Sequence, residues 1–354
     1  GRGVLLLIAP AGLVRLVEMD GPLKLGTRSR DLGLGTVPQL LELPNLTERG
    51  DGVVIGHGRK RPIRDNGDGH VLVMGPTRMG KGTGHVLPTL LGHSGSMLIF
   101  DPKHELAAIA GRHRATLGPV WIFDPTRRSS ARFNPLLELR LGDHLIGDCQ
   151  MMAHTLAPSS AAAGGEGKFW DDAARALLTA LLVQVRLSPD PTLRHLWHVA
   201  LAIKGGKYPR ALHEFVKAKL TSHRKMEART RSGVDETMLT HLSVLADPLI
   251  QAMTASSDFR ASDLQCDDRP VTVFVSVPVS DGQRLRPLTR VIMESIISPL
   301  SNDVNLTTDG RRKRRGVLVL LDEFPQLGRL DVVERKMPIC AGMGVRLAPV
   351  CQDD

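Results

Sequence analysis

Aromatic residues are scarce in this sequence: its 354 residues include eight Phe, three Trp and one Tyr. Proteins that stack the bases of single-stranded nucleic acid need a platform of aromatic side chains. The scarcity argues against an RRM-like RNA reader, and any contact with nucleic acid would have to be made to phosphates. The four cysteines are far apart and form no C-x-x-C pair. This spacing argues against a zinc ribbon or a disulfide framework and favours a reducing compartment.

Long hydrophobic runs are lacking as well. The run near the start covers only residues 4–14 and contains Pro10, whereas a membrane-spanning helix needs about 20 apolar residues. We expect a short buried helix here, and the alternative is the end of a membrane segment that precedes residue 1. Charge is present in excess: 46 Lys and Arg against 37 Asp and Glu give a net charge of +9, which suits a polyanionic partner.

Short apolar runs that end in turns dominate two parts of the chain. They are apolar at all or most positions and not at every second one, which indicates strands buried on both faces, as in a parallel sheet covered by helices. The region between them shows helical periodicity instead. The pattern predicts a three-layer α/β core with an inserted all-α domain. The six expected strands are 71–74, 97–100, 120–123, 271–277, 317–321 and 345–350.

A phosphate-binding loop follows the first of these runs and matches G-x-x-x-x-G-K between a strand and a helix. Its backbone N–H groups can face a phosphate, and Lys81 can neutralise the β- and γ-oxygens of ATP. Gly82 stands where the general motif has Ser or Thr, so Thr83 is the candidate Mg²⁺ ligand of this loop. Pro88 should kink or shorten the following helix. The candidate ATP-binding residues are Gly75, Pro76, Thr77, Arg78, Met79, Gly80, Lys81, Gly82 and Thr83.

Two adjacent acids end the apolar run 317–321. Asp322 is the candidate Mg²⁺ ligand, and Glu323 is the candidate general base that polarises the attacking water. A helix cap or a surface charge is the structural alternative for such acids. Gln352 follows the run 345–350, where it could sense the γ-phosphate, and an ordinary loop glutamine explains it comparably well.

Other polar residues have structural alternatives that weigh as much or more. Asp101 followed by Pro102 is typical of a helix N-cap, and Lys103 and Glu105 are the neighbours that we expect nearest the nucleotide. Two basic clusters, 217–231 and 311–315, could touch DNA, but a solvated surface is favoured for such charge runs. Trp170 is expected to anchor a core rather than to stack on a base.

With these residues, the chain resembles the type IV secretion coupling proteins, the TraG-class conjugative transfer ATPases. The resemblance covers about residues 52–352. Gly82 is typical of this family's own loop, whereas His104 departs from it, because the family usually has Gly there. The stretches that carry the resemblance, in the family's order, are 75–82, 101–105, 123–126, 131–135, 284–288, 321–328 and 341–346.

The resemblance implies a P-loop, RecA-like ATPase that works as a homohexamer with ATP and Mg²⁺. It implies catalytic roles for Lys81, Glu323 and Gln352, and an arginine finger from a neighbouring subunit that the sequence does not single out among Arg286, Arg290, Arg329 and Arg335. Such a protein recruits and translocates DNA, more often single-stranded, with relaxase or relaxosome proteins into a type IV secretion channel during conjugation. Its place is the cytoplasmic face of the bacterial inner membrane, so this portion itself would be cytoplasmic.

We therefore expect four regions, in a piece of a longer chain that would have membrane helices before residue 1 and further strands and helices after residue 354. Residues 1–66 form an irregular and possibly membrane-proximal lead-in, 67–141 the first part of the nucleotide-binding core, 142–263 the inserted all-α domain, and 264–354 the rest of the core. Two alternatives stay open. One is a double-stranded DNA translocase of the FtsK or HerA kind, and the other is a nucleotide-regulated substrate receptor without motor activity. Whether the cargo is DNA or an effector protein is also open.

Overall fold

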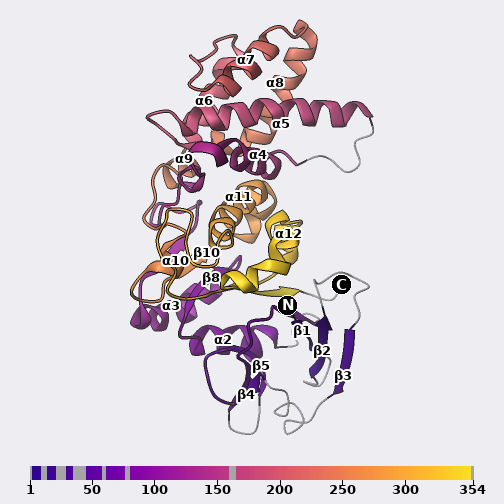
Figure 1. Cartoon of the computed structure of the whole chain (residues 1–354), viewed down its shortest axis with the longest axis vertical. Coiled ribbons are helices and arrows are strands. Elements are labelled where there is room, and N and C mark those ends of the chain that lie inside the picture. The colour runs from indigo at the N-terminus through magenta and orange to yellow at the C-terminus, as the bar shows by residue number, and fades with distance from the viewer. Residues whose placement is uncertain are drawn as a thin grey trace. The chain divides into compact units, whose positions relative to one another are not determined.

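A computed structural model describes residues 2–8, 14–20, 29–34, 45–57, 61–75, 80–158 and 165–351 (Figure 1). The chain divides into two units. The first comprises Gly1–Phe123, Ala261–Gly282 and Ile297–Asp354, and the second comprises Asp124–Arg260 and Gln283–Ile296. Among the described helices, none combines the length and the apolar character needed to cross a membrane.

A mostly parallel sheet organises the first unit. Within the described residues it has nine strands in the order β3-β2-β1-β7-β12-β11-β8-β10-β9. All six predicted strands are confirmed, and neighbours among them pair in parallel. Strands β8, β10 and β11 are buried at every residue, as their unbroken apolar runs predict. The six are β7 (Val71–Met74), β8 (Ser96–Phe100), β9 (Val120–Phe123), β10 (Thr272–Val275), β11 (Val317–Leu321) and β12 (Val345–Cys351).

The N-terminal residues extend this sheet. Strand β1 (Arg2–Ile8) pairs in parallel with β7 and antiparallel with β2 (Val14–Asp20), which pairs with β3 (Ser29–Leu34). The helix expected within 4–14 is therefore wrong for the part that β1 occupies. Periodicity does not separate a short buried helix from a strand, and the free edge of β7 supplies backbone partners that decide for the strand.

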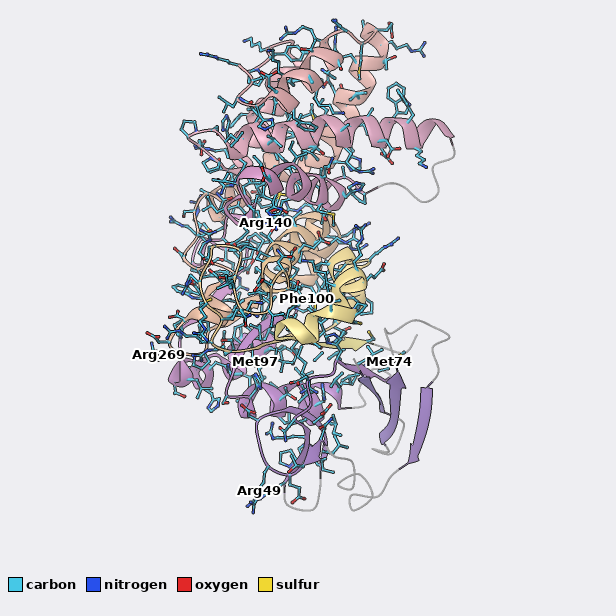
Figure 2. All side chains as sticks on the ribbon, in the orientation of Figure 1. Arg49, Met74, Met97, Phe100, Arg140 and Arg269 are labelled. Carbon is cyan, nitrogen blue, oxygen red and sulfur yellow. The ribbon has the colours of Figure 1, made fainter. Side chains whose placement is uncertain are left out.

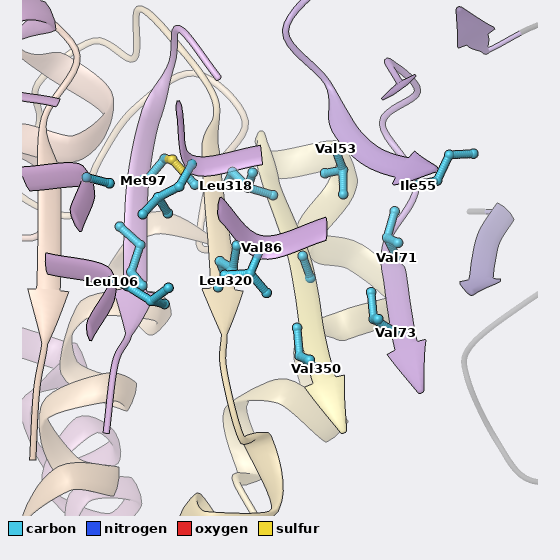
Figure 3. Close-up of a cluster of buried hydrophobic side chains, with 14 of the residues drawn as sticks. Val53, Ile55, Val71, Val73, Val86, Met97, Leu106, Leu318, Leu320 and Val350 are labelled. Carbon is cyan, nitrogen blue, oxygen red and sulfur yellow. The ribbon is translucent and has the colours of Figure 1, made fainter. Parts of the chain in front are cut away.

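A second, three-stranded antiparallel sheet has the order β4-β6-β5. It consists of β4 (Leu46–Thr47), β5 (Val53–His57) and β6 (Pro62–Asp65). The expectation of an irregular lead-in is therefore wrong for this stretch. Its strands are too short to show a period, but Val53, Ile55 and Ile63 are buried in one hydrophobic cluster with residues of β7, β8, β11 and β12 (Figure 3).

Helices flank the main sheet of the first unit. The predicted interruption at Pro88 is confirmed, because a π-type helical turn gives way to an α-helix one residue before it. These helices are the π turn η2 (Gly82–Val86), α2 (Leu87–Gly92), α3 (Glu105–Leu117), α10 (Asp263–Cys266) and α12 (Asp331–Cys340), with short 3₁₀ turns η6 (Val279–Asp281), η7 (Phe324–Leu327) and η8 (Ala341–Met343).

The second unit is helical throughout the part that the structure describes. Its long helix α5 (Gly165–Arg186) carries the predicted periodic run and is buried along residues 177–183. A Cβ at Gly233 would meet the ring of Trp170 at 2.6 Å, so this tryptophan packs against α8. The other helices are α4 (Leu145–Leu156), α6 (Leu193–Lys204), α7 (Glu214–Arg224), α8 (Ala228–Leu242), α9 (Pro248–Met253) and α11 (Gly282–Leu300, shared with the first unit), with 3₁₀ turns η3 (Pro135–Glu138), η4 (Gly142–His144) and η5 (Ser243–Ala246).

Candidate functional site

The predicted site residues follow the carboxyl ends of four adjacent parallel strands, β7, β12, β11 and β8. Met74 and Phe100, which end β7 and β8, are labelled in Figure 2. Phe100 pairs with Leu321, and the Asp322 N–H donates to the Phe100 oxygen at 3.2 Å. Met74 pairs with Cys351. The loop after β7 and the acids after β11 therefore lie at one edge of the sheet with only β12 between them, the position where open α/β sheets bind ligands.

Part of the predicted site lies outside the described residues. Gln352 and the loop residues 76–79, namely Pro76, Thr77, Arg78 and Met79, belong to this part, and their roles stay predictions. The described loop residues begin again at Gly80, whose φ of +82° is one that glycine adopts without strain. A Cβ at Gly82 or Gly84 would meet nothing within 4 Å. The backbone here is therefore open, as a phosphate cradle requires.

A wide helical turn follows the loop. The Leu87 N–H donates to the Gly82 oxygen, five residues back. Pro88 has no N–H to offer Gly84, its partner in a regular α-helix. The Gly84 oxygen instead lies 3.0 Å from Nε2 of His57, at the end of β5. A side chain from the small sheet thus replaces the hydrogen bond that Pro88 removes.

Two further contacts attach the small sheet to this helix through one residue, Val54. Its N–H donates to Oγ1 of Thr89 at 2.9 Å. Its oxygen accepts from Nδ1 of His85, whose ring is fully buried. Burial lowers the pKa of His85 to about 4, so the ring is neutral and carries its proton on Nδ1. His85 and Thr89 were not predicted from the sequence. Their i,i+4 spacing, which places both side chains on one face of a helix, was the available signal.

Lys81 faces the charges of the two acids. Its Nζ donates to the Gly75 oxygen. Burial lowers the pKa of Lys81, and the charges of Glu323 and Asp322 oppose that shift. Thr83 Oγ1 lies 3.4 Å from the Gly80 oxygen and is exposed. The charge of Lys81 therefore lies close enough to the two acids after β11 for them to act on its pKa.

The two acids after β11 differ in environment. Burial raises the pKa of Asp322 to about 6, and the neighbouring charge of Glu323 adds to the shift. Glu323 has a left-handed backbone with φ of +51° and precedes η7. Its Oε1 lies 2.7 Å from Nζ of Lys103. Lys103, which we expected near the nucleotide from its place after β8, thus contacts the candidate base, whereas Glu105 is exposed in the first turn of α3.

The turn between β8 and α3 places Lys103. Asp101 is buried, and its Oδ2 accepts from the Ala107 N–H at 2.9 Å, so it binds the first turn of α3. The predicted N-cap role of Asp101 is wrong, because α3 begins at Glu105, His104 is the N-cap and Pro102 lies ahead of the helix. Burial raises the pKa of Asp101. His104 has φ of +58°, a conformation that glycine adopts without strain. This conformation explains why Gly suits the position and what His104 changes: it adds backbone strain.

The residues at this edge fit a magnesium nucleotide. Asp322 is a buried carboxylate beside a second negative charge, a position where a bound cation is electrostatically favoured. Within the described residues, no group of three His, Cys, Asp or Glu side chains could hold a metal by itself. Mg²⁺ in phosphoryl-transfer sites takes one or two carboxylates and completes its shell with phosphates and waters. The donor set therefore suits Mg²⁺ delivered together with a nucleotide.

The basic cluster 311–315 is engaged in contacts within the first unit. Arg311 pairs with Asp263 at 2.5 Å, and Nζ of Lys313 donates to the Leu300 oxygen at 2.7 Å at the end of α11. Arg314 pairs with Asp268. These contacts show that the cluster anchors the chain ahead of β11, a role that neither of the two readings from sequence included.

The basic cluster 217–231 lies on α7 and the start of α8 in the second unit. Lys217 lies 3.5 Å from Glu214, and the guanidinium of Arg224 stacks 4.4 Å from the ring centroid of Tyr208. This cluster keeps more exposed charge than 311–315 does, with Lys217, Lys219 and Arg229 all exposed.

Comparisons with known proteins agree with these features. A family model described as type IV secretory system conjugative DNA transfer matches residues 43–354. The chain is 30% identical over 322 residues to the conjugal transfer protein TraG of Escherichia coli, covering 84% of this chain and 50% of that protein. It is 31% identical over 307 residues to VirD4 of Agrobacterium fabrum, covering 80% of this chain and 43% of that protein. The chain spans about half the length of these relatives.

Solved structures show the same fold at lower identity. The plasmid coupling protein TrwB in complex with ADP and Mg²⁺ superposes with a TM-score of 0.66 at 19% identity, covering 95% of this chain and 73% of that one. The P-loop-like core with a mostly parallel sheet is therefore confirmed. Because the family model matches most of its length, the chain belongs to the type IV secretion coupling proteins of conjugative DNA transfer.

Proposed function

We propose that this chain is the ATP-hydrolysing motor portion of a coupling protein that recruits DNA and moves it into a type IV secretion channel during conjugation. The observation that carries the proposal is the placement of Lys81, Asp322 and Glu323 after strands β7 and β11 at the carboxyl edge of one parallel sheet, where the charges of the two acids act on the pKa of Lys81. The match to conjugative transfer proteins, together with a structural neighbour that binds ADP and Mg²⁺, supports both the nucleotide and the process.

The roles of the residues follow from this geometry. ATP with Mg²⁺ supplies an electrophilic γ-phosphorus and a leaving group. Lys81 and the open backbone after it bind phosphate oxygens, while Asp322 and Thr83 are the Mg²⁺ ligands. The water attacks the γ-phosphorus in line with the leaving group, and Glu323 accepts the proton of this water. We assign Gln352, which follows β12 in the sequence, to sensing the γ-phosphate.

We also propose the wider setting by family membership. The protein works as a homohexamer at the cytoplasmic face of the inner membrane, its helical segment 142–263 meets the DNA or the relaxase-bound substrate, and single-stranded DNA is preferred. The exposed cations of 217–231 support this assignment, because phosphate contacts need no aromatic platform. The first 66 residues link the motor to the membrane side.

ATP hydrolysis by the full-length protein tests the proposal, with and without single-stranded and double-stranded DNA. We expect DNA to stimulate turnover, more strongly when single-stranded, and Lys81→Ala and Glu323→Gln each to lower it by about 100-fold or more. ATPase activity retained in both variants would contradict the assignment. Preferential stimulation by double-stranded DNA would favour a translocase of the FtsK or HerA kind, and hydrolysis without DNA movement in a transport assay would favour a substrate receptor.

A further inference from the structure

We propose that Lys103 is a positioning residue for ATP hydrolysis: its ammonium holds the Glu323 carboxylate in the orientation in which the carboxylate accepts the proton of the attacking water. The inference rests on the proposed function, because it assigns Lys103 a task in the reaction of that same site. It concerns a residue that approaches the base from β8, whereas Lys81 comes from the phosphate-binding loop after β7.

The sheet itself brings the two residues together. Strands β8 and β11 are neighbours, and Phe100 pairs with Leu321. Lys103 and Glu323 follow these paired ends by three and two residues, and Nζ and Oε1 come within 2.7 Å. The contact therefore depends on the register of the core, which fixes where each side chain starts.

The stability of the fold does not explain this ion pair. The side chains are 43% exposed for Lys103 and 13% exposed for Glu323. Pairs that are open to solvent contribute little to the stability of a fold because water and salt screen them. The stabilisation from such an ion pair does not offset the free-energy cost of a distorted backbone. A backbone distortion beside this pair therefore indicates a role other than stability.

Such a distortion is present on both sides of the pair. Among the described residues other than glycine, only His104 and Glu323 have positive φ, at 58° and 51°. For a residue with a Cβ, this conformation is less favourable than the right-handed region. His104 follows Lys103 directly, and Glu323 is the partner of Lys103. Both positions with positive φ among the described non-glycine residues therefore lie at this one contact. Strain gathers where the geometry of a side chain matters for chemistry.

A held carboxylate is what a general base needs. Glutamate has three rotatable side-chain bonds, and a misplacement of about 1 Å can cost about 100-fold in rate. Lys103 restricts this freedom by binding Oε1. Losing the ammonium should therefore lower the rate of the chemical step without changing how ATP binds.

Steady-state ATP hydrolysis by the full-length protein tests this, with Lys103→Met, which keeps the apolar stem, and Lys103→Arg, which keeps the charge. Arg112→Met, at an exposed cation on α3, is the matched control. We expect Lys103→Met to lower kcat by about 10- to 100-fold with unchanged KM, Lys103→Arg to restore most of it, and the control to match the wild type. In a Glu323→Gln background, Lys103→Met should cause no further loss.

The outcomes separate this inference from the proposed function. A wild-type kcat in Lys103→Met, with Glu323→Gln inactive, overturns the inference alone. A raised KM would make Lys103 a phosphate ligand and overturn it as well, as would a further loss in the Glu323→Gln background. Absence of hydrolysis by the wild type overturns the proposed function, and the inference with it.

A cross-linking measurement reports the pair without any turnover. A carbodiimide converts the Glu323 carboxylate to an O-acylisourea, and the deprotonated Lys103 amine then attacks, forms an amide and expels a urea. Mass spectrometry should find peptides containing residues 103 and 323 joined in the wild type and in Arg112→Met. The product should be missing in Lys103→Met and in Glu323→Gln. Its absence from the wild type overturns the inference.

Discussion

Buried polar groups are arranged differently in the two units of this protein. In the helical unit, Tyr208 Oη lies 3.0 Å from Nδ1 of His223, and Nε2 of the same ring lies 3.2 Å from Asp235. At the sheet edge of the other unit, Asp322 has a pKa raised to about 6, and Glu323 reaches Lys103 from a left-handed backbone. The first arrangement brings its imidazole and carboxylate together from the regular helices α7 and α8, whereas the second keeps charge and strain in place. Of the two arrangements, only the one at the sheet edge is prepared for a ligand.

The largest effect is expected from Glu323→Gln. Removing a general base lowers kcat by about 10²- to 10⁴-fold, while the free energy of unfolding changes by less than about 1 kcal/mol because the ion pair is partly exposed. Hydrolysis rates and urea unfolding of the same preparation check both parts. A loss of stability comparable with the loss of activity would erase the contrast between the two regions.

The pH dependence of stability should reveal His85. Its folded pKa of about 4 lies below the unfolded value of 6.5, so the unfolded state binds more protons between these values. The neutral, buried ring contributes fully to the free energy of unfolding above pH 6.5. This contribution is lost as the pH falls toward 4, and the free energy of unfolding decreases by about 3 kcal/mol in total. Unfolding of the wild type and of His85→Gln should be compared from pH 7.5 to 4. Parallel curves for the two proteins would show that the ring is not held neutral by burial.

A substitution in the helical unit should have the opposite effect to Glu323→Gln: it should lower the free energy of unfolding and leave kcat unchanged. Asp235→Ala leaves the buried His223 without its neighbour and should lower the free energy of unfolding by about 2 kcal/mol. Because the change lies outside the sheet edge, we expect kcat for ATP of the folded protein to stay at the wild-type value. Thermal unfolding and hydrolysis below the transition provide the measurement, and the exposed neighbour Glu236→Ala serves as control.

The smallest effect is expected from His104→Gly. Glycine adopts φ near 58° without strain but loses more backbone entropy on folding. These terms oppose each other, so stability should rise by less than about 1 kcal/mol. Denaturant unfolding measures it, with Ala108→Gly in the middle of α3 as a control that should lose up to about 1 kcal/mol. A destabilisation equal to the control's would show that this turn is not strained.

The sequence predicted those parts of the molecule whose signal is local. The six core strands were visible because the residues of each run are all or mostly apolar, and the phosphate-binding loop and the acid pair were visible from spacing alone. The Lys103–Glu323 contact depends on the register between β8 and β11. This register is not visible in the sequence, so the sequence indicated only a place near the nucleotide site for Lys103. The contacts of His57 and His85 were missed for a related reason: β5 is short and its partners are side chains of a helix. Likewise, the edge of β7 decided the conformation of residues 2–8.

The strand order has a consequence for biosynthesis. Strand β11 enters the sheet between β12 and β8, yet Asp322 is translated 241 residues after Lys81 (322 − 81). At about 5–20 residues per second, the ribosome needs roughly 10–50 s to cover that distance. During this interval β7 and β8 have no central neighbour, and their apolar faces and free edges are open to wrong partners. The helical segment made in the meantime can fold from local contacts, so a nascent chain should hold a finished helical unit before its sheet can close.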